Sequence, residues 1–241
     1  MKIIRSLYIA LACLAFAPTP SLLADDAQEA AMAATDKLLA HLGGRDAWAA
    51  AHGAYVYEVH VSKWARLPYT HQVWIDFDQP RVMVRVENQD LRQLRGLNGP
   101  NDGWWIQEGE IAPYTPEFQA DEHKRWIASP YRVLHLAANG DGSVSQTFTD
   151  DGELEFSLGG TPVLRFALDD DGKPTAFSRF NNDFASSSAL GRLEAYGDVT
   201  LWRTAGTPDG NFVSHNLKFQ LLPNGPGISF EPPADLNNIE R

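Results

Sequence analysis

Cysteine is almost absent from this chain of 241 residues, and the single one, Cys13, lies in an apolar run near the N-terminus. Removal of that run would leave no thiol, which excludes disulfides, thiolate metal sites and a cysteine nucleophile from the rest of the chain. An exported chain without disulfides fits a bacterial periplasm better than a harsher exterior.

Clusters of basic residues are also missing. The chain has 20 basic and 31 acidic residues, a formal net charge of −11. Without residues 1–24, which include Lys2 and Arg5, 18 basic and 31 acidic residues remain, a formal charge of −13. Binding to a phosphate backbone needs a basic face. We therefore predict that nucleic acid is not a partner.

Long apolar runs are limited to one, from Leu7 to Ala17, which is too short to cross a bilayer as a helix. Basic residues precede it, and prolines and small residues follow it, as is typical of a secretory signal peptide. We predict cleavage after Ala24, giving a signal peptide at 1–24 and a single periplasmic domain at 25–241. Because Ala10 stands three residues before Cys13, where a lipoprotein signal favours leucine, we expect no lipid anchor.

Sequence motifs for catalysis or metal binding are lacking as well. The histidines form no HExxH or His-x-His pattern, and two acidic turns, "DDDGK" and "NGDGS", lack the glutamate that completes a calcium loop. The "SSSAL" segment lacks the glycines of a hydrolase elbow. The sequence therefore predicts no catalytic residue, no metal, no cofactor and no enzyme activity.

Two histidines leave one alternative open. His60 and His71 can fall on adjacent strands, where one register would bring them together across the hairpin. The polar face of a sheet is the commoner reason for such residues, so we do not predict a zinc site from them.

Helical patterns appear at the start and in the middle of the chain. Residues 25–42 carry one apolar stripe and end at two glycines. A short helical turn anchored by Trp48 follows. In the middle, a hydroxyl residue before proline predicts helices at 116–128 and 130–138. Their apolar residues include Phe118, Trp126, Ile127, Val133 and Leu134.

Strand patterns occupy the rest of the chain. "YVYEVHVSK" alternates Tyr55, Tyr57, Val59 and Val61 with polar residues, and similar segments follow it between short turns. Later strands are separated by Asp-Gly dipeptides, which favour tight hairpin turns. The sequence predicts a mainly β fold with some α, a large antiparallel sheet of roughly nine to eleven strands.

Aromatic residues are plentiful, with seven tryptophans and twelve phenylalanines. Trp104 and Trp105 are adjacent, and on a strand successive side chains point to opposite faces. One of them should face a lined interior and the other should lie outside or at the rim. Aromatic residues under a helical lid can line a pocket for an acyl chain, can stack on a sugar if exposed, or can simply fill a core.

The order of these elements resembles a known family. A helix ending in "HLGGRDAW", then the strand "DQPRVMVRVE", the turn and strand "NGPNDGWWI", a helical insertion and further strands are similar to the periplasmic lipoprotein-carrier superfamily, which includes LolA, LolB and LppX-type proteins. The resemblance implies a half-open antiparallel β-barrel whose concave face is covered by helices, here 25–42, 116–128 and 130–138. The arginine that carrier members use near the cavity mouth has no match in this sequence.

These observations together lead to a functional hypothesis. We predict a monomeric periplasmic protein that binds a lipid or acyl chain in a cavity between sheet and lid, with envelope lipoproteins as candidate partners. The predicted ligand-binding residues are Trp104, Trp105, Phe118, Trp126, Ile127, Val133 and Leu134. The alternatives are an envelope protein that binds or hydrolyses glycans, and an interaction module with a solid core.

Overall fold

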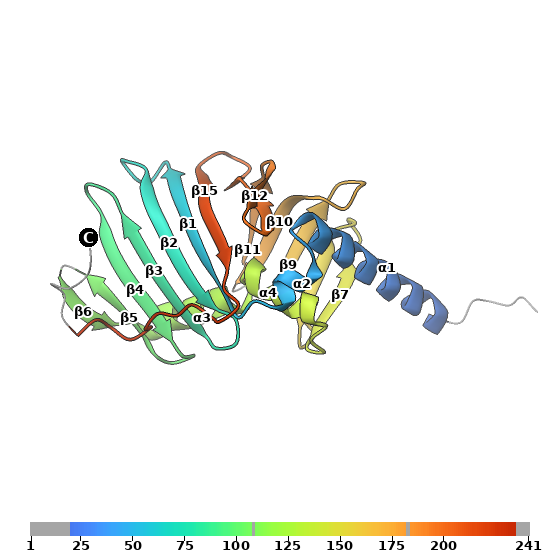
Figure 1. The fold of residues 1–241 in the computed structure, drawn as a ribbon, viewed down its shortest axis with the longest axis horizontal. Coiled ribbons are helices and arrows are strands. Elements are labelled where there is room, and N and C mark those ends of the chain that lie inside the picture. The colour runs from blue at the N-terminus through green and yellow to red at the C-terminus, as the bar shows by residue number, and fades with distance from the viewer. Residues whose placement is uncertain (1–19, 108, 182–183, 235–241) are drawn as a thin grey trace, which may run out of the picture.

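The computed structural model describes residues 20–107, 109–181 and 184–234 (Figure 1). Its helices are α1 (Pro20–His41), α2 (Arg45–Ala49), α3 (Pro116–Ile127) and α4 (Pro130–Asn139). Its strands are β1 (Gly53–Ser62), β2 (Tyr69–Asp76), β3 (Arg81–Glu87), β4 (Arg92–Asn98), β5 (Gly103–Gln107), β6 (Glu110–Pro113), β7 (Val144–Phe148), β8 (Leu154–Leu158), β9 (Thr161–Leu168), β10 (Pro174–Asn181), β11 (Phe184–Leu190), β12 (Leu193–Tyr196), β13 (Val199–Trp202), β14 (Thr204–Gly206) and β15 (Phe212–Leu221).

The predicted signal peptide lies outside the described residues, except for residues 20–24, which belong to α1. Among the helices that the structure describes, none combines the length and the apolar character needed to cross a membrane.

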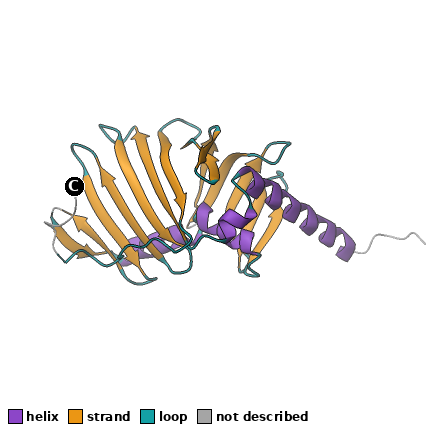
Figure 2. Ribbon diagram, viewed as in Figure 1, coloured by secondary structure: helices purple, strands orange, loops and turns teal. Residues whose placement is uncertain are grey.

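Thirteen of the strands form one antiparallel sheet (Figures 1 and 2). The order across it is β6-β5-β4-β3-β2-β1-β15-β14-β11-β10-β9-β8-β7. The first six strands pair in chain order because short turns connect them, and β15 returns to pair with β1 and join the two halves. The strands β6 and β7 are its two edges, so the sheet is open and is not closed into a barrel. The predicted large antiparallel sheet is confirmed.

The predicted strand count of nine to eleven was wrong, because the described residues contain fifteen strands. Two segments whose sequences predict single strands, "GWWIQEGEI" and "RLEAYGDVTLW", are hairpins, β5 with β6 and β12 with β13. Gly109 and Gly197 turn these hairpins at φ values of 82° and 65°, which glycine adopts without steric cost. The strands β11 and β14 are rich in serine, alanine or glycine, which have little β propensity, and were not predicted.

Helices α3 and α4 pack on one face of the sheet, which we call the concave face. Helix α3 contacts both β4 and β10, although the six strands β3, β2, β1, β15, β14 and β11 lie between these two in the sheet. The sheet must therefore curve around the helix. This placement agrees with the predicted helical cover at 116–128 and 130–138.

Helix α1, the third helix of the predicted cover at residues 25–42, contacts α4 and shares its hydrophobic core. It packs against β7 and β8 at one end of the sheet, where Leu38 and Leu39 are fully buried. Figure 1 shows its N-terminal half extending away from the sheet. None of its described residues lines the cavity under α3 and α4.

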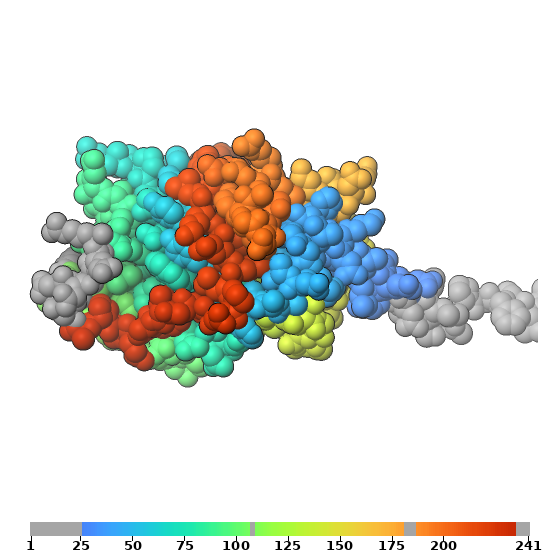
Figure 3. All heavy atoms as spheres, in the orientation of Figure 1, coloured from blue at the N-terminus to red at the C-terminus, as the bar shows by residue number. Residues whose placement is uncertain are grey.

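The opposite, convex face is crossed by the segment after β15, residues 222–234, which Figures 1 and 3 show in red in front of the sheet. Phe230 in this segment packs with Met83 and Trp104. The Trp104 indole Nε1 donates a hydrogen bond to the Phe230 carbonyl at 2.8 Å, and the Arg81 guanidinium lies 5.5 Å from the Phe230 ring centroid. The C-terminal segment thus closes a small aromatic cluster on the convex face.

Candidate functional site

Trp104 and Trp105 point to opposite faces of the sheet. Trp105 pairs with Arg95 of β4, whose side chain reaches the concave face, and its ring lies 5.1 Å from that of Phe118. Trp104 pairs with Gly96 and packs on the convex face beside Phe230. The prediction that the two indoles face opposite sides is confirmed, although neither lines the cavity.

A cavity of about 220 Å³ lies between the concave face and the helices α3 and α4. Side chains from β1 to β4 form one wall, and side chains from β10, β11, β13, β14 and β15 form the other. Its lining is mostly apolar, with Val56, Val73, Ile75, Val82, Val84, Trp126, Pro130, Tyr131, Phe177, Trp202, Ala205 and Phe212 as the apolar and aromatic residues.

Rows of paired residues across the sheet change from apolar to charged within this cavity. Val56, Val73 and Val84 lie side by side across β1, β2 and β3. In the next row along β1, Glu58 lies opposite His71 of β2. The cavity therefore has an apolar end and a charged end.

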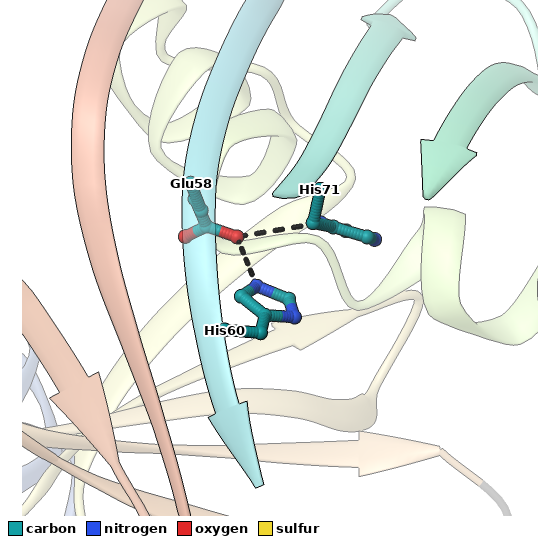
Figure 4. A group of neighbouring side chains, drawn as sticks. All are labelled: Glu58, His60 and His71. Atoms are coloured by element: carbon teal, nitrogen blue, oxygen red, sulfur yellow. Dashed lines mark hydrogen bonds and ion pairs between the residues drawn. The ribbon is translucent and has the colours of Figure 1, made fainter. Parts of the chain in front are cut away.

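Glu58, His60 and His71 form the first charged group (Figure 4). The Glu58 carboxylate oxygen Oε2 lies 2.8 Å from His60 Nε2 and 3.4 Å from His71 Nδ1. Burial alone would raise the pKa of Glu58, but hydrogen bonds from the two imidazoles outweigh it and lower the pKa to about 2. Burial lowers the pKa of His71, while its contact with Glu58 opposes that shift. Glu58 is thus an anion at neutral pH, held by two imidazoles.

A second charged group joins the sheet to α3. Glu122 of α3 is buried and lies 2.6 Å from Arg125 Nη1 and 3.6 Å from Arg95 Nε of β4. A buried carboxylate needs such partners, because an unpaired ion in a protein interior is costly. This group therefore ties α3 to the sheet at the charged end of the cavity.

Among the polar atoms at the cavity wall that have no hydrogen-bond partner in the described residues, two lie outside the two charged groups. They are the buried Nε of Arg179 on β10 and the hydroxyl of Ser129, the residue before α4. Burial lowers the pKa of the Arg179 guanidinium. A bound molecule with acceptor atoms could satisfy both groups, because each can donate a hydrogen bond.

The predicted site residues are only partly brought together. Trp126 lines the cavity, and its indole donates a hydrogen bond to the Asp76 carbonyl at 2.6 Å. Val133 and Leu134 are fully buried in the main core. Phe118 and Ile127 are half-buried and pack against that core without lining the cavity.

The charged residues of the cavity were not predicted from the sequence. In β1 the period of alternation was right, but the residues that face the cavity are Val56, Glu58 and His60, and Tyr55 lies on the convex side against Trp74. The only advance signal was the possible pairing of His60 and His71, and the hairpin register does bring their ring centroids to 4.4 Å.

Exposed tryptophans in a row, which would favour sugar binding, are not found among the described residues. Of the seven tryptophans, Trp64 alone is exposed, at 72%, and the other six are buried or half-buried.

Comparison with models of protein families finds no match, and neither does comparison with curated proteins. Solved structures do resemble the chain. A DUF1329 family protein from Desulfovibrio piger aligns at a TM-score of 0.49 and 10% identity, over 84% of this chain and 95% of that chain. A "putative outer membrane lipoprotein-sorting protein domain" from Vibrio parahaemolyticus aligns at 0.41 and 10%, over 80% of this chain and 92% of that chain. At 10% identity, both alignments concern the fold alone.

Proposed function

We propose that this chain is a non-enzymatic binding or carrier protein of the bacterial envelope whose ligand is amphipathic, with an acyl chain and a polar head. The observation that supports the proposal is the cavity under α3 and α4, which is apolar along the Val56, Val73 and Val84 row and charged around Glu58 and Arg179. An acyl chain would pack on the valines, and a head with acceptor atoms would meet the donors at the other end.

The size of the cavity indicates that α3 and α4 must move for a long chain to enter. Its volume of about 220 Å³ is below the roughly 300–1,000 Å³ of pockets for drug-sized ligands. Trp126 covers the cavity from α3 and is itself buried. Burial of a large side chain contributes roughly 1.5–3 kcal/mol, so an acyl chain that replaced Trp126 would offset the cost of opening.

The N-terminal sequence indicates where in the cell the protein would act. The apolar run after Lys2 and Arg5 favours export to the periplasm, where envelope lipids and lipoproteins supply acyl chains. We expect a chain that acts there as a carrier to work as a monomer.

Binding is tested first on the wild-type protein. Native mass spectrometry of protein purified from the periplasm is expected to show a co-purified lipid mass, and the stripped protein is expected to bind a fluorescent fatty-acid probe. A wild-type protein that carries no lipid and binds no probe would favour the solid-core interaction module instead.

Two matched variants then place the binding in the cavity. Ala205 lines the cavity on β14, and Ala195 is exposed on β12. Ala205→Phe should fill the cavity and weaken probe binding by about tenfold or more, a loss of at least 1.4 kcal/mol, while Ala195→Phe should leave binding unchanged. Circular dichroism is used to check that both variants fold. Equal probe binding by the two folded variants would contradict a ligand in this cavity.

A further inference from the structure

The hairpin of β1 and β2 brings together three side chains of the kinds that bind metals, one carboxylate and two imidazoles, at one point of the cavity wall. Glu58 lies directly opposite His71 in the register, and His60 follows two residues later on the same face of β1. One ligand atom from each of the three lies within 4.8 Å of the others. Figure 4 shows both imidazoles turned toward the Glu58 carboxylate.

The distances between these atoms suit a tetrahedral ion. Ligands at 2.0–2.1 Å from zinc stand about 3.3 Å from one another in a tetrahedron. The Glu58 oxygen lies 2.8 Å from His60 Nε2 and 3.4 Å from His71 Nδ1. All three ligand atoms lie within 4.8 Å of one another, so an ion among them would need the side chains to move closer together, with no change of strand register.

The surroundings of the three side chains also fit a metal ligand set. The His60 imidazole is nine-tenths buried, with 9% of its side chain exposed, and Glu58 is exposed by only 12%. His71 Nδ1 is buried and has no hydrogen-bond partner that meets a normal geometry among the described residues.

We propose that Glu58, His60 and His71 bind a divalent transition-metal ion of the zinc class, with a fourth position open to the cavity. Two imidazoles with one carboxylate favour zinc and its first-row neighbours over calcium or magnesium, which prefer oxygen ligands. Three protein ligands leave one position free, and all three side chains line the cavity, so the free position faces the space where a ligand would lie. Two arginines of the sheet, Arg95 and Arg179, also line the cavity, and Arg95 faces Glu122, which offsets part of its charge.

Metal binding is measured on the full chain without a histidine tag, after treatment with a chelator. Calorimetry is expected to show one Zn²⁺ bound per chain, and Co²⁺ is expected to give the visible absorption of a tetrahedral site. His60→Gln and Glu58→Gln should each weaken Zn²⁺ binding more than about 100-fold, because loss of outer partners alone costs about 10–100-fold.

His52 and Asp78 supply a matched control, because they form a histidine–carboxylate pair at the same 2.8 Å on the surface, without a third ligand. His52→Gln should leave Zn²⁺ binding unchanged. Equal losses in His52→Gln and His60→Gln, or a wild-type chain that binds no Zn²⁺, would overturn the proposal.

If the cavity variants do not fold, X-ray absorption of the zinc-loaded wild-type protein tests the site instead. Two imidazoles and one carboxylate are the expected ligands, and any other ligand set would overturn the proposal. None of these measurements requires a lipid.

Discussion

The two faces of the sheet are covered in different ways. On the convex face, Trp104, Met83 and Phe230 fill the space between the sheet and the C-terminal segment, and Gly96 allows the indole to lie flat on β4. On the concave face, the helices leave a cavity, and charged side chains stand in its wall. The convex face is therefore built for packing alone, whereas the concave face retains groups that packing does not require.

Buried charge is the sharpest difference between the faces. The concave Glu122 is only 6% exposed and bridges Arg95 and Arg125, whereas the convex Glu87 is 30% exposed beside Arg85 and Arg92. Burying charged groups costs free energy, so a wall of this kind is retained more often for binding than for stability. Variants at matched positions on the two faces test whether they differ in the stability that depends on buried charge.

The largest effect is expected from removing the buried carboxylate. Glu122→Ala should lower the free energy of unfolding by roughly 3–5 kcal/mol, because Arg95 would remain charged and half-enclosed without its partner. Glu87→Ala on the convex face should cost about 0–1 kcal/mol, since exposed ion pairs contribute little. Urea unfolding followed by circular dichroism measures both, and similar losses would remove the contrast in buried charge.

Two glycines on adjacent strands test the packing of each face. A methyl group at Gly96 would meet the Trp104 indole at 2.7 Å on the convex side, and one at Gly103 would overlap Tyr114 and Gln119 on the concave side. Each Gly→Ala variant should lose roughly 1–3 kcal/mol of stability through overpacking. Only Gly103→Ala should also change binding of the fatty-acid probe, because Gln119 belongs to α3. A probe affinity that changes equally in both variants would argue against α3 as the lid.

The hydroxyl residues before α3 and α4 give a finer comparison. Thr115 Oγ1 accepts a hydrogen bond from the Phe118 amide at 3.3 Å, whereas Ser129 makes no such capping bond. Thr115→Ala should therefore cost about 1 kcal/mol of stability, and Ser129→Ala should change it by less than about 0.5 kcal/mol. Thermal unfolding separates the two. A large loss in Ser129→Ala would mean that this hydroxyl supports the fold.

The smallest expected effect concerns pH and a histidine away from the cavity. Burial lowers the pKa of His135, although its hydrogen bond with the Trp48 carbonyl and the charge of Asp78 oppose that shift, and His52 and Arg132 add to it. The unfolded chain therefore takes up a proton at this residue below its ordinary pKa of 6.5 while the folded chain resists, so stability falls as the pH drops from 6.5.

His135→Gln should remove this part of the pH dependence. Between pH 7 and pH 5, the variant should lose less stability than the wild-type protein, by a difference under roughly 1 kcal/mol. Urea midpoints at the two pH values measure it. Parallel losses in variant and wild type would show that His135 does not titrate differently in the two states.

Much of the architecture could be predicted from local patterns. The prolines after Thr115 and Ser129 marked the starts of α3 and α4 at residues 116 and 130, because proline fits only the first turn of a helix. The strand periodicity predicted the antiparallel sheet and the opposite directions of Trp104 and Trp105. The hairpins at Gly109 and Gly197 were missed, because a single glycine inside a strand pattern can mark a turn or a bulge.

The composition of the cavity could not be predicted in the same way. In β1 the alternation of side chains was evident, but Tyr55, on the more apolar set, lies on the convex face, and Glu58 and His60 lie toward the helices. Hydrophobicity alone would place the more apolar set, which contains Tyr55, toward the helices. The pairing of β1 with β2 and β15 instead decides which face of β1 meets α3.

The sequence by itself determined the sheet, the inserted helices and the two-residue period that separates Trp104 from Trp105, because propensity, turn chemistry and alternation act over a few residues. Only the tertiary structure decided that Glu58 meets His71 and that Glu122 meets Arg95, because these contacts depend on register and on where α3 crosses the sheet. A shift of one residue in the register of β1, β2 or β4 would turn Glu58, His71 or Arg95 to the other face of the sheet.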